Sequence, residues 1–175
     1  SRCNYRANQK LMNLLHLNIG SNQDRRKNIR SALEQLEFFF EKITISSLFE
    51  SPAEGFNGND FYNIGVNVET QKKVPEVVNI LHQIEDSLGR NRALPKFSSR
   101  IIDLDLVLYD DVIDEELNVP RKDILRYAFV LAPVTELNPD GIHPVKGISY
   151  TKLWEDFQSN MIFELKKHSI DKLYS

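Results

Sequence analysis

The spacing of apolar residues changes repeatedly along the chain, and each change marks an expected element. Alternation of apolar and polar residues indicates half-buried strands, whereas apolar residues every three or four positions indicate helices with one apolar stripe. The sequence therefore predicts a strand, a helix, two strands, a helix and a strand, over residues 15–19, 24–40, 43–49, 61–69, 75–88 and 101–109. This order is that of a split βαβ arrangement, so we expect an antiparallel or mixed sheet with helices on one face.

The remaining third of the chain carries weaker patterns. A short helix is expected after Val119-Pro120 and is predicted to close at Pro133, and another helix is expected at 149–157. Residues 161–175 are weakly amphipathic and are interpreted as a C-terminal tail. Residues 1–13 are interpreted as an N-terminal extension or linker, which leaves 14–160 as one α+β domain.

Composition narrows the class of protein. The chain has 175 residues and a net charge of −3, so it fits a single core and has no overall attraction for nucleic acid or anionic membranes. It contains no apolar run of the roughly 18 residues that a membrane span requires. The single cysteine, Cys3, excludes an intrachain disulfide and favours a reducing, cytoplasmic compartment.

Two aspartates on the last predicted strand are the strongest candidates for chemistry. Asp103 and Asp105 lie two residues apart, so both carboxylates leave one face of the strand while Ile102, Leu104 and Leu106 enter the core. Neighbouring like charges are costly unless a cation neutralises them, and Mg²⁺ prefers carboxylate oxygens. A solvated pair bonded to nearby basic side chains explains the same spacing.

Four basic residues just before this strand change the interpretation. Arg90, Arg92, Lys96 and Arg100 gather beside the two acids in an otherwise acidic chain. Phosphoryl transfer depends on positioning and on neutralising charge with Mg²⁺ and with Arg or Lys side chains, which this set provides. A network of surface salt bridges is the alternative. On another strand, Phe61 and Asn63 share a face that would suit a planar heterocycle.

The motifs together resemble the 6-hydroxymethyl-7,8-dihydropterin pyrophosphokinase family, which makes AMP and a pterin diphosphate from ATP and a pterin alcohol. The resemblance runs from about residue 15 to 153. It is carried by Gly20-Ser21-Asn22, Ser51-Pro52, Phe61-Tyr62-Asn63, residues 85–92, Asn138-Pro139-Asp140-Gly141 with His143-Pro144, and above all residues 96–106, which read KFSSRIIDLDL. The family fold is a ferredoxin-like α/β sandwich with long catalytic loops, in agreement with the predicted order of elements.

The resemblance also implies roles for individual residues. Asp103 and Asp105 would bind two Mg²⁺ ions with ATP, and Arg90 and Arg100 would stabilise the transferred diphosphate. The implied ATP contacts are Arg92, Lys96, Arg121, Arg126 and Tyr127, and the implied pterin contacts are Ser51, Phe61, Asn63 and Phe129. Fusion to other folate-pathway enzymes, or a position beside them, is a further expectation.

Some positions depart from the family pattern. Arg121 stands where the family usually has His, and Tyr127 aligns with a usual Arg, so Arg121 or Arg126 would have to supply the positive charge. Ser98 and Phe97 also differ from the usual residues. Two alternatives therefore stay open beside the pyrophosphokinase: an inactive domain that binds pterin or nucleotide, and a kinase that transfers a single phosphate.

Overall fold

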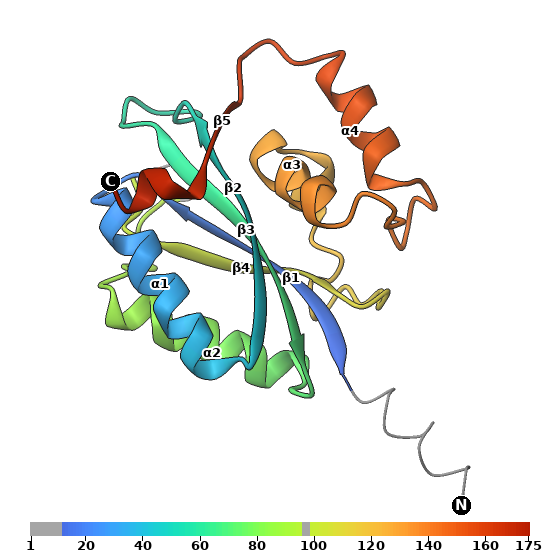
Figure 1. Cartoon of the computed structure of the whole chain (residues 1–175), viewed down its shortest axis with the longest axis horizontal. Coiled ribbons are helices and arrows are strands. Elements are labelled where there is room, and N and C mark those ends of the chain that lie inside the picture. The colour runs from blue at the N-terminus through green and yellow to red at the C-terminus, as the bar shows by residue number, and fades with distance from the viewer. Residues whose placement is uncertain (1–11, 96–98) are drawn as a thin grey trace, which may run out of the picture.

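One antiparallel sheet organises the protein. The structure, a computed structural model, describes residues 12–95 and 99–175 (Figure 1). Within these residues five strands pair in the order β4-β1-β3-β2-β5, with bounds β1 (Asn13–Ser21), β2 (Lys42–Ser51), β3 (Phe61–Thr70), β4 (Asp103–Tyr109) and β5 (Lys166–His168). The helices are α1 (Arg25–Phe39), α2 (Val74–Ser87), α3 (Ala128–Leu137) and α4 (Tyr150–Gln158), with short 3-10 helices η2 (Lys122–Leu125) and η3 (Ile170–Leu173). The predicted order of the first six elements is confirmed.

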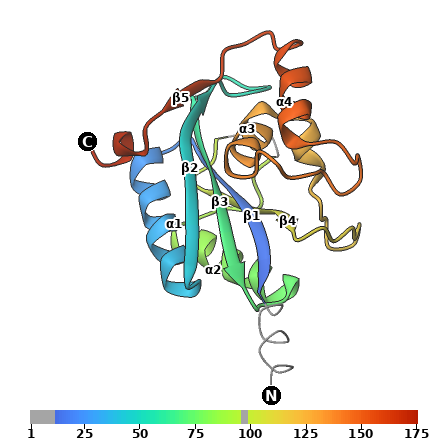
Figure 2. The ribbon, with the colours of Figure 1, turned by 45° about the vertical axis from the view of Figure 1, so that its right-hand side comes forward.

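Helices cover both faces of the sheet, so the expectation of helices on one face was wrong (Figures 1 and 2). The α1 and α2 helices pack on the face that carries the alternating apolar residues of β1 and β3, as predicted. The α3 helix packs on the other face. There a Cβ added to Gly65 would come within 2.5 Å of the Pro133 Cβ atom, which shows how closely the two backbones approach. The missing side chain of Gly65 makes room for α3.

Pro133 lies inside α3 and does not end it, contrary to the sequence prediction. A proline inside a helix removes one backbone hydrogen bond. However, Val130, Leu131 and Val134 are buried in a second apolar cluster between α3, η2 and α4. Burial of these side chains outweighs the local cost of the proline, so α3 continues to Leu137.

The C-terminal residues join the sheet, although their sequence pattern indicated no element. The β5 strand pairs with β2 through three register positions, from Leu48 opposite His168 to Glu50 opposite Lys166. Leu173 in η3 has no exposed surface and belongs to the main core. A strand of three residues is too short to produce a recognisable alternation, and this explains why the sequence did not reveal it.

A buried histidine on β1 gives a testable prediction about stability. His16 is 1% exposed, and its Nδ1 atom lies 2.8 Å from Oδ1 of Asn67, to which it donates. Burial lowers the pKa of His16 from 6.5 to about 4, and the hydrogen bond to Asn67 acts in the opposite direction. The unfolded chain therefore binds the proton first as the pH falls. We expect the contribution of the neutral ring, up to about 3 kcal/mol, to be present above pH 6.5 and lost between pH 6.5 and 4.

Urea unfolding of the wild type and of His16→Asn at several pH values between 7 and 4 measures this contribution. Asparagine keeps a donor for Asn67 and does not titrate in this range, so the variant should lose less stability on acidification. Parallel pH profiles for the two proteins would contradict the prediction.

Candidate active site

A cavity of about 510 Å³ opens at one end of the sheet. The C-terminal end of β1 meets the first residues of β3 and β4 there, because Gly20 pairs with Asn63 on one side and with Asp103 on the other. The cavity is also bordered by the end of α2, the segment before β4, and residues 121–130. Antiparallel pairing thus brings residues from distant parts of the sequence to one opening.

Most of the residues implicated by the sequence line this cavity. They are Ser51, Phe61, Asn63, Arg90, Arg92, Arg100, Asp103, Asp105, Arg121, Tyr127 and Phe129. Arg126 lies elsewhere, in a separate hollow that also contains Lys122 and His143. Lys96 lies outside the described residues.

The two β4 aspartates face the cavity, and the residues between and beside them are buried. Leu104 is 3% exposed, whereas the Asp103 and Asp105 side chains are 40% and 25% exposed. The Nε atom of Arg90 lies 3.8 Å from Oδ1 of Asp103, and an Nη atom of Arg121 lies 3.6 Å from Oδ1 of Asp105. The predicted alternation on this strand is confirmed.

Electrostatic strain is concentrated at Asp105. Burial raises the pKa of Asp105 to about 7, and the carboxylate of Asp103 adds to the rise, whereas Arg121 opposes it. A carboxylate in this situation gains strongly from any additional cation. Among the described residues, no three His, Cys, Asp or Glu side chains are grouped closely enough to hold a metal. A cation here would need ligands from water or substrate, and Mg²⁺ commonly takes such ligands.

The basic side chains are held at set positions around the aspartates. Arg121 donates through Nε to Oδ2 of Asp123 at 2.9 Å, and Arg92 bonds Asp86. Arg100 is only 7% exposed, and burial lowers the pKa of its guanidinium, with neighbouring Arg90 adding to the effect. Arginines this close to a pair of carboxylates suit an anionic ligand that binds together with a metal cation: the arginines face the anion, and the carboxylates face the cation.

Aromatic rings form the other half of the cavity lining. Phe56 meets Phe61 edge to face at 6.3 Å between centroids, and Tyr127 stacks on Phe129 at 5.1 Å with an angle of 15° between the ring planes. Asn63 lies near the rings and is 3% exposed. A flat ring with a polar edge would find both stacking and hydrogen-bonding groups here.

Comparison with known proteins identifies the family. Residues 16–139 match the family described as 7,8-dihydro-6-hydroxymethylpterin-pyrophosphokinase (HPPK). The chain belongs to the HPPK family.

Relatives of this HPPK-family chain occur both as single enzymes and inside longer proteins. A 2-amino-4-hydroxy-6-hydroxymethyldihydropteridine pyrophosphokinase of Aquifex aeolicus is 34% identical over 151 residues, which cover 84% of this chain and 91% of that protein. The folic acid synthesis protein fol1 of Pneumocystis carinii is 33% identical over 90% of this chain but only 22% of its own length. The bifunctional protein FolKE of Lactococcus lactis is 34% identical over 72% of this chain and 38% of its own length.

Solved structures agree on the fold of the HPPK-family chain. The HPPK-DHPS structure of Plasmodium falciparum superposes with a TM-score of 0.68 at 15% sequence identity. The superposed region covers 86% of this chain and 45% of the Plasmodium falciparum chain. The predicted ferredoxin-like arrangement, with helices packed on an antiparallel sheet, is therefore confirmed.

Glu85 is a cavity residue of this HPPK-family chain that the sequence reasoning did not single out. Its Oε2 accepts a hydrogen bond of 3.1 Å from the Leu104 backbone N–H, and its Oε1 accepts one of 3.1 Å from Arg92. Burial raises the pKa of Glu85, the bond from Leu104 lowers it, and Asp103 raises it further. The sequence did contain a signal for its burial. Glu85 is a charged residue four positions after Leu81, so it lies on the apolar stripe of α2.

Two small residues on β1 shape the polar end of the cavity. A Cβ at Gly20 would lie 2.7 Å from Oδ1 of Asn63, so only glycine leaves room for that amide. Asn18 donates through Nδ2 to the same oxygen at 3.1 Å. Asn18 thereby fixes the orientation of the Asn63 amide. The strand pattern gave no indication of this, because the sequence shows only a polar residue in alternation.

Proposed function

We propose that this HPPK-family chain transfers a diphosphate from ATP to 6-hydroxymethyl-7,8-dihydropterin and releases AMP. The hydroxymethyl oxygen attacks the β-phosphorus of ATP, the bond from that phosphorus to the oxygen on the α-phosphate breaks, and the hydroxyl proton is lost. The observation that carries the proposal is one cavity lined by an aspartate pair, four arginines and several aromatic rings. The charged groups can neutralise phosphate charge at one end of the cavity, and the aromatic rings can bind a planar ring at the other.

In this proposal, Asp103 and Asp105 hold two Mg²⁺ ions that arrive with ATP. The rise in the pKa of Asp105 and the small number of carboxylates support a site that is completed by nucleotide phosphates. When bound, Mg²⁺ neutralises phosphate charge. Arg90 and Arg100 stabilise charge on the transferred diphosphate.

Further ATP contacts are proposed for Arg92, Lys96, Arg121, Arg126 and Tyr127. Arg121 is the better candidate to replace the usual positive charge, since it lines the cavity beside Asp105 and Arg126 does not. A guanidinium reaches farther than an imidazole and offers more donors. Tyr127, which stacks on Phe129, supports ring binding more than phosphate binding.

The pterin is proposed to lie between Phe61 and Phe129, with Asn63 contacting its polar edge and Ser51 bordering the site. Phe129→Ala should raise the KM for the pterin about tenfold, because stacking on an aromatic side chain contributes about 1–3 kcal/mol, while the KM for ATP should change little. Steady-state kinetics with each substrate varied measures this difference. Phe157→Ala is the matched control, since Phe157 stacks on Trp154 away from the cavity. Equal effects of the two substitutions on the pterin KM would contradict the assignment.

Identification of the nucleotide product tests the proposed function. Purified protein with Mg²⁺, ATP and the pterin alcohol should give AMP and pterin diphosphate in equal amounts. ADP in place of AMP would indicate a kinase that transfers one phosphate. Binding of pterin or nucleotide without any product would indicate an inactive binding domain.

The cellular setting is also a proposal. The chain spans most of the Aquifex aeolicus relative but about a fifth of the Pneumocystis carinii protein, so this module functions both by itself and within longer enzymes among relatives. We propose that it works in the cytoplasm, beside or fused to other folate-pathway enzymes. In the part of the chain that the structure describes, no helix has the length and apolar character needed to cross a bilayer.

A further inference from the structure

Asn22, the residue after β1, is bonded to the segment that carries Arg100. Asn22 is buried, with only 2% of its surface exposed. The backbone N–H of Asn22 donates to the Arg100 carbonyl oxygen at 3.0 Å, and Oδ1 of Asn22 accepts from the Arg100 N–H at 2.7 Å. Two hydrogen bonds between the same two residues fix the backbone of Arg100 relative to β1.

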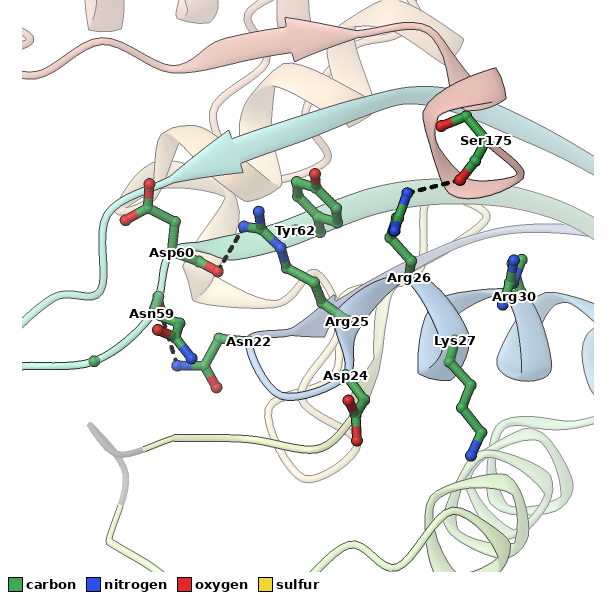
Figure 3. A pocket seen from close by; sticks show the side chains of 11 residues that line it. Asn22, Asp24, Arg25, Arg26, Lys27, Arg30, Asn59, Asp60, Tyr62 and Ser175 are labelled. Carbon is green, nitrogen blue, oxygen red and sulfur yellow. Dashed lines mark hydrogen bonds between the residues drawn. The ribbon is translucent and has the colours of Figure 1, made fainter.

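The other end of the same amide is bonded to a different segment. Nδ2 of Asn22 donates to the carbonyl oxygen of Asn59 at 3.1 Å, in the loop between β2 and β3 (Figure 3). It also lies 3.4 Å from Oγ of Ser99. One planar, buried amide therefore joins the β2–β3 loop to the segment before β4.

These two segments serve opposite halves of the cavity. Arg100 belongs to the basic half, whereas the β2–β3 loop carries Phe56, which packs against Phe61. The segments also approach directly, because a Cβ at Gly58 would lie 2.5 Å from the Phe56 ring and 3.3 Å from Oγ of Ser99. The path of hydrogen bonds and contacts from Arg100 to the aromatic half of the cavity is therefore short.

The loop is held from its other side as well. Arg25, in the first turn of α1, donates to the Asp60 carbonyl oxygen at 2.9 Å and lies over the ring of Tyr62 (Figure 3). It also forms an ion pair of 2.8 Å with Glu50 on β2. Asp60 is consequently anchored to α1 and β2. Asn59, one residue earlier, is held through Asn22, so the Asn22 amide determines how this end of the loop sits against Arg100.

We propose that Asn22 is a positioning residue that couples nucleotide binding to pterin binding. The inference rests on the proposed function and adds a residue to it. Nucleotide phosphates that engage Arg100 stabilise one position of its backbone, and the Asn22 amide imposes the matching position on the β2–β3 loop. By linkage, nucleotide and pterin then raise each other's affinity by the same factor.

The experiment measures the pterin Kd by calorimetry with and without a Mg²⁺-bound ATP analogue that cannot be cleaved between the α- and β-phosphates. Asn22→Asp keeps an acceptor for the Arg100 N–H but loses the donor to Asn59. We expect the analogue to tighten pterin binding in the wild type, and the ratio of the two Kd values to fall about fivefold in Asn22→Asp, as for loss of one hydrogen bond. Asn22→Ser, with a side chain too short to reach Asn59, should lose the coupling too.

Gln23→Ala is the control, because Gln23 is the exposed next residue and its carbonyl, which the substitution keeps, makes the local bonds to Ser21 and Asn28. The proposal is overturned if the wild type shows no coupling, if Asn22→Asp and Asn22→Ser keep the wild-type ratio, or if Gln23→Ala loses it equally. A purely structural role would lower thermal stability without changing the ratio. Failure of the wild type to form AMP would instead contradict the proposed function, so the two failures are distinguishable.

Discussion

Asp105→Asn should lower turnover of ATP and the pterin alcohol by at least a factor of about 100. Groups that stabilise developing charge in a transition state typically contribute about 3–4 kcal/mol each. The substitution keeps the shape of the side chain and removes its charge, so the loss reports on electrostatics. Steady-state assays over a range of Mg²⁺ concentrations should also show that the variant needs more Mg²⁺ for half of its maximal rate.

The same substitution should not destabilise the metal-free protein. The pKa of Asp105 is raised above its usual value of 3.8 to about 7, so the folded protein retains this proton over a range in which the unfolded chain has lost it. The corresponding stability is fully present below pH 3.8 and is lost as the pH rises through about 7. At pH 8 the variant should therefore unfold at an equal or higher urea concentration than the wild type.

Asp111→Asn is the control for this prediction. Asp111 is an exposed carboxylate in the turn after β4, and its substitution by asparagine removes the same formal charge. Its turnover and Mg²⁺ dependence should match the wild type. Near-normal turnover of Asp105→Asn with an unchanged Mg²⁺ requirement would contradict the metal assignment.

Glu85→Ala should destabilise the protein by about 3 kcal/mol and also reduce turnover. Removing one partner from a buried ionic network typically costs 3–5 kcal/mol, and the value here lies at the lower end because Arg92 keeps Asp86 as a partner. The Leu104 N–H would lose its acceptor, and Arg90 would lose a carboxylate 4.0 Å away. Urea unfolding measures the first effect, and product formation below the unfolding transition measures the second.

Two further variants sharpen the Glu85 prediction. Glu85→Gln retains an acceptor for the Leu104 N–H and loses the charge, so its stability should fall between those of the wild type and Glu85→Ala. Gln83→Ala, on the exposed side of α2, should change stability by less than about 0.5 kcal/mol. Equal stability of Glu85→Ala and Gln83→Ala would show that the network does not stabilise the fold.

The sequence predicted the order of the main elements because each strand or helix has an unambiguous apolar side. It also predicted most of the described residues that line the cavity, with Arg126 as an exception: Asp103 and Asp105 alternate with buried neighbours, and Gly20 on the adjacent strand pairs with Asp103. The roles assigned to these residues stay predictions, since they concern bound substrates and ions.

The sequence did not predict that both faces of the sheet are covered. The second face carries polar or small residues such as His16, Asn63 and Gly65, which in alternation indicate exposure to solvent. In the structure His16 and Asn63 are buried and bonded to other side chains, and Gly65 admits α3. Alternation distinguishes apolar from polar residues but does not reveal polar side chains that find partners inside the protein.

The ion pair between Arg121 and Asp105 has a consequence for the choice of ligand. Before substrate arrives, the guanidinium is already paired with the deeper of the two carboxylates at 3.6 Å, although the pKa of Asp105 remains raised. A free hydrated Mg²⁺ ion must compete with this internal cation while offering no replacement partner for it. A nucleotide-bound ion brings phosphate oxygens that accept the displaced guanidinium. We therefore expect the protein to discriminate in favour of metal that is already chelated by nucleotide over the bare ion.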